Sequence, residues 1–460
     1  MRLLSIPLVF LPSAIFPLAA LMIGLRNPSI FQAPALLSDS RLSALLFLFA
    51  FGTTFIFSRR SKQLRENFLG LLLFFLFSSG YFLLASIFNK PDINTNNIYF
   101  AADSWSWLQR MALEDGWVVG TRAVHPLTPI IFRPLISLLS PITGGDRFHA
   151  NLIILALAGG GCVFLTWKIV KLISEDQSLA VLFASLLGLS ASHLIFASVI
   201  ESYIFSTLCL LLFIWLLLTN QSAYLLIAAG VLTLGITVTN IVQQALATIF
   251  VQRNLRHMIV IFSCVILLGI GLNVISHSIY PVPYFFLPQN LMEERGFLQE
   301  ISIKRAGLMA ENLLIYNIAA PQPYISIRRE MPRFNFLTGT IQGYAWFGWP
   351  ALILWIAMLA LTFFYFLKKI RSNSNNKYFS LSMLFCLIFN FLLHLSYGVE
   401  PFLYSADWTY ALILFTAITL NGLVERTWFK IMLFVLVVSI FINNLGLLYI
   451  IARKVSEYLA

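Results

Sequence analysis

Charged residues are scarce in this chain. Asp, Glu, Lys and Arg together make up 11% of its 460 residues, whereas hydrophobic residues make up 59%. A soluble domain normally contains about 25% charged residues, and fewer than half of its residues are apolar. The composition therefore excludes an ordinary soluble protein and indicates a polytopic, all-α membrane protein.

Cysteine is also rare, and its placement argues against disulfides and cysteine metal sites. Each cysteine lies inside an apolar run, and no two share a short motif. They are Cys162, Cys209, Cys264 and Cys386. Packed thiols are the expected state of such residues. No cofactor is predicted, although the adjacent carboxylates of Glu114 and Asp115 have the oxygen ligands that a divalent cation prefers.

Long apolar runs recur along the whole chain. A membrane-spanning helix needs about 20 apolar residues when it stands upright in the bilayer. The runs predict such helices near 4–25, 42–58, 67–88, 149–173, 178–197, 202–219, 222–239, 258–279, 341–367, 378–397, 409–424 and 431–451. A shorter apolar piece at 240–251 is interpreted as a half-span, so the chain is expected to cross the membrane about 12 or 13 times.

Lysine and arginine gather in short loops between these runs. Two examples are SRRSKQLREN at 58–67 and KKIRSNSNNK at 368–377. If the N-terminus is cytoplasmic, all the basic clusters fall on the cytoplasmic side, as the positive-inside rule requires. The net charge of +11 is therefore interpreted as loops facing anionic lipid, and nucleic acid is not an expected partner.

This topology leaves two long non-cytoplasmic loops, at 89–148 and 280–340. Both are expected to carry amphipathic helices. Prolines interrupt the apolar segment TPIIFRPLISLLSPI, which favours a helix lying on the membrane over a span. The alternating charge of MEERGFLQEISIKRAGLMAENLL predicts a helix on the surface. The predicted divisions are an N-terminal hairpin with a basic loop (1–66), a transmembrane core (67–279), an outer loop (280–340) and C-terminal helices (341–460).

Asp103 is the candidate catalytic residue. It lies in YFAADSWSWLQRM, within the polar stretch Asn97–Pro134 that follows the third span. A carboxylate near low-dielectric surroundings has a raised pKa or pairs with a cation, and either state suits a general base acting on a hydroxyl. The alternative is a structural role as the N-cap of the helix that begins at Ser104. The neighbouring tryptophans either stack on sugar rings or anchor the loop at the membrane interface.

Three further polar residues are candidates for substrate binding. His125, fixed by the proline that follows it, is suited to donate to a phosphate or to order an acceptor. Glu201 is an acid near the outer end of a span, where carboxylates mark function or an ion pair. Asn240 begins the half-span, where its amide either lines a cavity or holds helices together.

Arginines in the second outer loop are candidates for binding a phosphate, because guanidinium groups bind phosphate bidentately and keep their charge. The candidates are Arg305, Arg328, Arg329 and Arg333. Contact with anionic lipid headgroups is the alternative. Glu400 and Tyr404 lie beside the membrane in the last outer segment and complete the predicted binding set.

The order of these segments resembles the GT-C superfamily of multi-pass glycosyltransferases. The likeness is strongest to the bacterial branch related to protein O-mannosyltransferases and aminoarabinose transferases. It rests on HPLTPIIFRPLISLLSPITGGDRFHANLI, SVIESYIFSTLCLLLFIWLLL, GITVTN and EPFLYSADWTYALILF. The resemblance implies a polyprenyl-phosphate sugar donor and a catalytic Asp in the first outer loop, which is Asp103 here. Ser104 replaces the second acid of the pair that many members have, and His125 opens His-Pro-Leu-Thr where many relatives have His-Pro-Pro-Gly.

We therefore predict an inverting glycosyltransferase of the bacterial inner membrane, with its site on the periplasmic side. Asp103 would deprotonate a hydroxyl of a protein, lipid or glycan acceptor, and polyprenyl phosphate would leave. Three alternatives stay open: a transporter or flippase of a lipid-linked sugar, an enzyme similar to O-antigen ligases or polymerases, and a non-catalytic scaffold. A flippase would use a cavity between broken helices.

Overall fold

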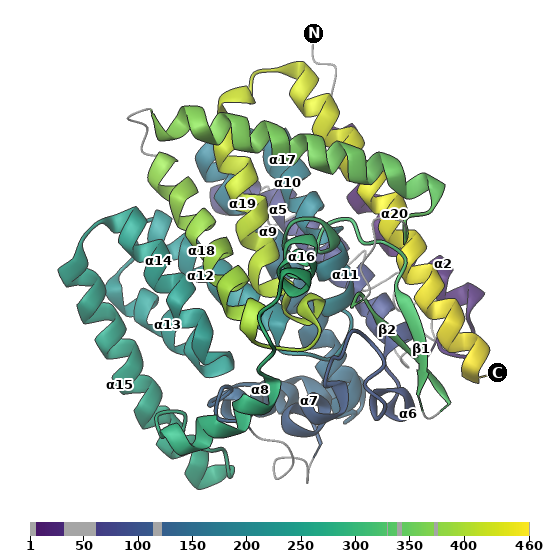
Figure 1. Cartoon of the computed structure of the whole chain (residues 1–460), viewed down its shortest axis with the longest axis vertical. Helices are drawn as coiled ribbons and strands as arrows, with labels where there is room; N and C mark the ends of the chain where they lie inside the picture. Colours follow the sequence, from purple (N-terminus) through teal and green to yellow (C-terminus); the bar gives the residue numbers. More distant parts are fainter. Residues whose placement is uncertain are drawn as a thin grey trace.

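The computed structural model describes residues 6–31, 61–113, 122–328, 330–337, 343–371 and 376–459. Most of the described chain is helical, and the described residues contain one sheet, a two-stranded hairpin (Figure 1). The predicted span at 42–58 lies outside the described residues, as do Glu114, Asp115 and Arg329.

Six of the described helices are long and apolar enough to cross a membrane. They are α5 (Lys62–Phe88), α9 (Arg147–Ser174), α15 (Leu255–Ile279), α17 (Trp349–Ile370), α18 (Asn376–Ser396) and α20 (Thr427–Leu459). Four of them match a predicted span to within about five residues at both ends, whereas α17 begins later and α20 ends later than predicted. The structure thus confirms a mainly helical chain, and its six long apolar helices are compatible with a multi-pass membrane protein.

Other apolar helices are only 12 to 16 residues long, shorter than an upright span. They are α2 (Leu11–Arg26), α10 (Gln177–Gly188), α12 (Tyr203–Leu218), α13 (Ala223–Ile236), α14 (Ile241–Gln252) and α19 (Ala406–Thr419). The predicted span at 178–197 is broken, because α10 ends at Gly188 and α11 (Ala191–Phe196) begins after Ser190. Such breaks are stable at membrane depth only where protein satisfies the freed backbone groups.

Glycines allow α5 and α9 to pack closely. A Cβ atom added to Gly160 of α9 would lie 2.1 Å from Ser78 Oγ and 2.7 Å from the carbonyl oxygen of Phe74, both in α5. Small residues that let helix backbones approach are typical of membrane helix interfaces. The Tyr81 hydroxyl of α5 also donates to the Gly188 carbonyl over 2.7 Å, so α5 supports the break after α10.

The second outer loop differs from its prediction. It contains the 3-10 segment η4 (Pro288–Phe297) and a short helix, α16 (Ile303–Glu311), which ends in a π turn, so the continuous surface helix predicted here is wrong. Residues 316–320 are buried inside the bundle. The Ser192 N–H donates to the Asn317 carbonyl over 3.0 Å, and the Asn444 amide donates to the Ile318 carbonyl over 2.7 Å.

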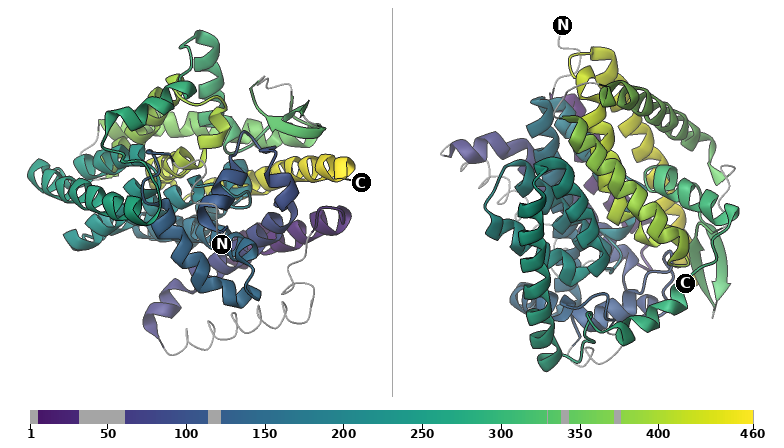
Figure 2. Two further views of the ribbon diagram at one scale, coloured as in Figure 1. Left: turned by 90° about the horizontal axis from the view of Figure 1, so that it is seen from below. Right: turned by 60° about the vertical axis from the view of Figure 1, so that its left-hand side comes forward.

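The loop then forms an antiparallel hairpin of β1 (Tyr324–Arg328) and β2 (Met331–Asn335). Phe334 of β2 pairs with Tyr99, and the Phe100 N–H donates to the Phe334 carbonyl over 2.9 Å. The two outer loops are therefore joined. In both views of Figure 2 the hairpin stands out from the helices at one margin of the molecule.

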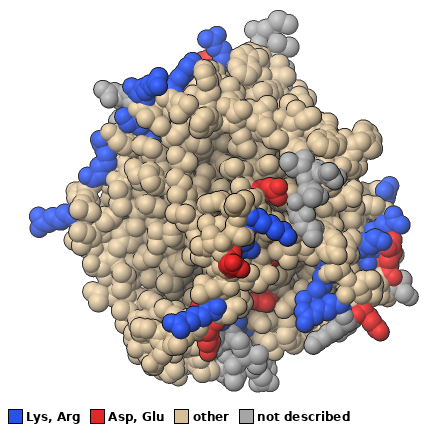
Figure 3. Space-filling model, viewed as in Figure 1, with Lys and Arg blue, Asp and Glu red and all other residues tan. Residues whose placement is uncertain are grey.

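Charged side chains are unevenly distributed over the face shown in Figure 3. Lys and Arg line its upper and left margins with few acidic neighbours, whereas Asp and Glu lie among basic residues in its lower half. A positive-inside topology predicts such a separation of charge. That the margin rich in Lys and Arg faces the cytoplasm stays a prediction.

Candidate functional site

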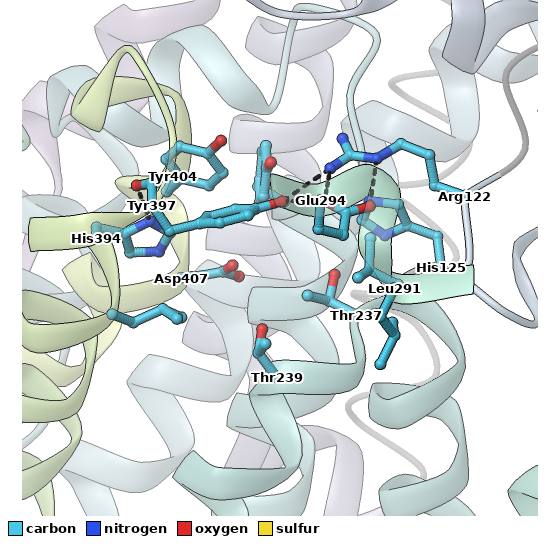
Figure 4. Close-up of a pocket in the computed structure, with 13 residues that line it drawn as sticks. Arg122, His125, Thr237, Thr239, Leu291, Glu294, His394, Tyr397, Tyr404 and Asp407 are labelled. Atoms are coloured by element: carbon cyan, nitrogen blue, oxygen red, sulfur yellow. Dashed lines mark hydrogen bonds and ion pairs between the residues drawn. The ribbon is translucent and has the colours of Figure 1, made fainter. Parts of the chain in front are cut away.

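A cavity of about 260 Å³ lies where several helix ends meet. Its walls come from the first outer loop, the start of α12, the turn between α13 and α14, η4, and the neighbouring ends of α18 and α19 (Figure 4). The lining residues are Arg122, Val124, His125, Tyr203, Thr237, Thr239, Leu291, Glu294, Leu393, His394, Tyr397, Tyr404 and Asp407.

Arg122 and Glu294 form an ion pair on one wall of the cavity (Figure 4). Arg122 Nε donates to Glu294 Oε1 over 2.9 Å, and the same guanidinium donates to the Tyr397 hydroxyl over 2.8 Å. Burial lowers the pKa of Arg122, but the hydrogen bonds and charge of Glu294 outweigh it, and the pKa is raised overall. The pair connects the first outer loop, η4 and the end of α18.

Asp103 lies half-buried just before α7 (Ser104–Met111). Its side chain does not cap the helix; Asn97 Nδ2 donates to its Oδ1 over 3.3 Å instead. Phe100 and Ala101, shortly before it, have left-handed φ angles of 49° and 59°. Such strain in residues other than glycine persists only where the surroundings impose it, and it clusters at functional sites.

Glu201, in the turn between α11 and α12, contacts this loop. Its Oε2 accepts from the backbone N–H of Asp103 over 3.0 Å, and its Oε1 accepts from the Ser202 N–H over 2.9 Å. Burial, and then the nearby charge of Asp103, raise the pKa of Glu201 to about 8. Burial also raises the pKa of Asp103, while the charges of Arg122 and Arg110 act to lower it.

Arg110 of α7 completes this group of charges. It is 4% exposed, its guanidinium lies 4.8 Å from the centre of the Trp107 ring, and burial lowers its pKa to about 10 against the opposing charges of Glu201 and Asp103. Two guanidinium groups and two carboxyl groups are thus close enough to influence one another, an arrangement suited to proton transfer near a developing negative charge. Arg122 is the member of this group that lines the cavity; Asp103, Glu201 and Arg110 are not part of the lining.

His125 is neutral in this setting. Its Nδ1 lies 2.6 Å from the carbonyl oxygen of Ile236, which can only accept, so Nδ1 carries the hydrogen. Burial, together with the charges of Arg122 and Arg110, lowers its pKa to about 3. Its other nitrogen, Nε2, is therefore an acceptor. This state fits the predicted role of ordering an acceptor hydroxyl better than that of donating to a phosphate.

Asp407 and Tyr404 lie on the opposite wall, near His394 (Figure 4). Asn240 is not part of the lining, but its amide donates to Asp407 Oδ1 over 3.1 Å. The Tyr404 ring stacks on His394 with 4.2 Å between ring centres. Of the predicted binding residues, the structure brings His125 and Tyr404 into the cavity and Asn240 directly behind Asp407, whereas Glu201 contacts Asp103 and Ser202, which are not part of the lining.

The described arginines of the predicted phosphate-binding set, Arg305, Arg328 and Arg333, do not line the cavity. Arg305 donates to the backbone carbonyls of Val399 and His394, Arg333 donates to that of Asn96, and Arg328 is exposed on the hairpin. Their expected grouping around a phosphate is therefore not found, because the hairpin and the backbone carbonyls direct these side chains elsewhere.

Glu400 does not line the cavity either. It is 1% exposed, and its Oε2 accepts from the Phe336 N–H over 3.3 Å. Burial raises its pKa to about 7. The bond to Phe336 holds the start of η8 (Pro401–Tyr404) against the segment after β2, and in the described residues the other oxygen of Glu400 has no hydrogen bond.

Sequence reasoning did not select Arg122, Glu294 or Tyr397. Arg122 lies three residues before His125 in the polar stretch Asn97–Pro134. The polar composition of that stretch was therefore a signal that could have identified Arg122 as a candidate. The described residues contain no cluster of three or more His, Cys, Asp or Glu side chains that could hold a metal ion. Comparison with models of known protein families, with curated proteins and with solved structures finds no match to the chain. The resemblance to GT-C glycosyltransferases therefore stays a prediction.

Proposed function

We propose that the protein is an integral-membrane glycosyltransferase with a GT-C-like fold. It moves a sugar from a polyprenyl-phosphate donor to an acceptor hydroxyl on the non-cytoplasmic face. The observation that carries the proposal is the position of Asp103: a half-buried carboxylate, anchored through its backbone to Glu201, with two arginines close enough to affect its pKa.

Asp103 acts as the general base. The raised pKa gives its carboxylate more affinity for a proton than an exposed aspartate has. The acceptor hydroxyl transfers its proton to Asp103, and its oxygen attacks the anomeric carbon. The bond from that carbon to the phosphate oxygen breaks, and the electron pair leaves on polyprenyl phosphate. Because this is a single displacement, the anomeric centre is inverted.

Arg122 takes over the role first assigned to the arginines of the second outer loop. Its guanidinium lines the cavity and already binds a carboxylate bidentately, in the geometry that also suits a phosphate. Fixed positive charge at the departing oxygen stabilises the transition state. Arg110 contributes a second positive charge from α7.

A transporter of a lipid-linked sugar is the second candidate. It is favoured by the place of the cavity between the short helices α12, α13 and α14, since transporters bind substrates where helices are broken. The two functions differ in their product, because only the transferase makes a new covalent bond.

The deciding experiment supplies purified protein in liposomes with radiolabelled polyprenyl-phosphate sugar and extracts of acceptor lipids, glycans and peptides. A labelled product that resists mild acid, which releases sugar from the phosphate donor, supports the transferase. Movement of intact donor between leaflets, with no such product, supports the transporter and contradicts this proposal.

A further inference from the structure

We propose that the wall of the cavity that carries Asp407 is a binding subsite for an uncharged, polyhydroxylated ring, in which Asp407 accepts hydrogen bonds from ring hydroxyls. The inference rests on the proposed function for the identity of the ring as the transferred or accepting sugar. Its location rests on the geometry around Asp407 alone.

The carboxyl group of Asp407 has one oxygen free for a ligand. The residue is 3% exposed and lines the cavity from the first turn of α19. Oδ1 accepts from Asn240, whereas Oδ2 has no hydrogen bond to any described residue. No described lysine or arginine forms an ion pair with Asp407. A carboxyl oxygen on the wall of a poorly hydrated cavity is stabilised by a hydrogen-bond donor, which favours a ligand that supplies donors.

A chain of amides fixes the direction of this carboxyl group. Gln243 donates to Asn240 Oδ1 over 3.0 Å, and the Tyr410 hydroxyl donates to Gln243 Oε1 over 2.8 Å. Asn240 therefore has its own acceptor satisfied and presents its amide to Asp407. Because these partners are buried, the carboxyl group is oriented before any ligand binds.

The walls around Asp407 suit a sugar ring. Tyr404 stacks on His394, and Tyr203 packs edge-on against Tyr404 at 5.2 Å, which gives flat apolar faces with polar edges. Thr237 and Thr239 add hydroxyl groups (Figure 4). The volume of 260 Å³ is below the range of about 300–1,000 Å³ that is usual for drug-sized ligands. The cavity therefore suits a ligand smaller than a typical drug, on the scale of a single ring.

Charge selects against an acidic sugar. Arg122 is the cation of the lining, and it is already paired with Glu294, so the wall that carries Asp407 offers no unpaired cation to an acidic ring. A ring that carries a carboxylate would bury an unpaired charge in a water-poor cavity, which is costly, and such a cost is a common source of specificity. Neutral sugars should therefore bind and uronic acids should be rejected.

The test uses a matched pair of probes, methyl β-D-glucopyranoside and methyl β-D-glucuronide, which differ in the carboxylate at C6. Each is titrated into the full-length protein in nanodiscs, and binding is followed by intrinsic tryptophan fluorescence, since Trp408 adjoins Asp407 and Trp107 contacts His125 at 4.9 Å. We expect the neutral glycoside to bind at least about 10-fold more tightly. Equal binding, or tighter binding of the glucuronide, overturns the proposal.

The variant Asp407→Asn keeps the shape and the acceptor for Asn240 but puts an NH2 group in place of Oδ2. It should bind the neutral glycoside several-fold more weakly, because the oxygen that accepts from the ring hydroxyls is lost. The control Asp176→Asn, whose carboxylate pairs with Lys430 on other elements, should bind like the wild type. If Asp407→Asn does not fold, the comparison of the two glycosides on the wild-type protein still tests the proposal.

Methyl 2-amino-2-deoxy-β-D-glucopyranoside serves as a third probe. Preference for this ammonium sugar, lost in Asp407→Asn, would show that Asp407 pairs with a cation and would overturn the uncharged class. The proposal is separable from the proposed function. Discrimination between glycosides without any transfer product rejects the transferase and keeps the subsite, whereas transfer without discrimination rejects the subsite.

Discussion

The backbone N–H of Asp103 donates a hydrogen bond to the carboxyl group of Glu201, with 3.0 Å between the nitrogen and Oε2, although the two residues are 98 positions apart. The contact fixes the strained loop that carries Asp103 to the start of α12. Glu201 is therefore expected to act through the position of Asp103 and not through direct contact with the substrate.

Glu201→Gln should change how the stability of the protein depends on pH. Burial raises the pKa of Glu201 from its usual 4.5 to about 8, so the folded state disfavours the ionised form. Its contribution to stability is complete below about pH 4.5 and is lost as the pH rises towards about 8. Relative to Glu201→Gln, the wild type should therefore lose more than about 1 kcal/mol over this interval. Thermal unfolding in nanodiscs across this pH range measures the difference.

The matched control for this prediction is Glu66→Gln. Glu66 is an exposed acid that pairs with Lys62 on the surface of α5. Glu66→Gln should therefore show the same dependence of stability on pH as the wild type. A Glu201→Gln curve that runs parallel to the wild type would mean that Glu201 does not carry a raised pKa.

The ion pair of Arg122 and Glu294 should compete with the phosphate of the donor. Glu294→Gln removes the internal carboxylate and should lower the KM for the donor several-fold. Arg122→Lys keeps the charge but loses bidentate binding, so the KM should rise about 10-fold or more. Steady-state kinetics over a range of donor concentrations tests both variants. An unchanged KM in both would remove Arg122 from the phosphate site.

Close packing of α5 and α9 should make Gly160 intolerant of a side chain. Gly160→Ala places a methyl group against Ser78 and the Phe74 carbonyl and should destabilise the protein by about 1–3 kcal/mol. Gly271→Ala is the control, because a Cβ atom there meets nothing within 4 Å and alanine favours the helix by about 1 kcal/mol. Thermal melting should rank Gly271→Ala above Gly160→Ala, and the reverse order would contradict the packing described.

Apolar periodicity and run length were enough to predict most helices. The predicted span at 258–279 became α15, and the half-span at 240–251 became α14. The break at Ser190 was not predicted, although Ser190, Ser192 and His193 interrupt the apolar run, because the tyrosine that stabilises the break comes from another helix. The hairpin was missed although YISIR alternates, since the charged residues nearby favoured a reading as exposed loop.

The site was harder to predict than the helices. Asp103 and Glu201 were both selected, each for the cost of an acid near the membrane, but their contact joins distant parts of the chain. Arg122 and Glu294 are 172 positions apart, and no local pattern records that pairing. Arg305 was selected as a phosphate ligand because of its charge. In the structure its N–H groups donate to backbone carbonyls, which charge alone does not reveal.

The most direct test of the central claim is the transfer of radiolabelled sugar from polyprenyl phosphate by Asp103→Asn, compared with the wild type and with Asp176→Asn at equal membrane abundance. The variant keeps the backbone donor to Glu201 and loses the base. General bases accelerate reactions by about 100-fold to 10,000-fold. We therefore predict that Asp103→Asn lowers the rate of transfer by at least about 100-fold, whereas Asp176→Asn does not. Transfer by Asp103→Asn at the rate of Asp176→Asn would contradict the account.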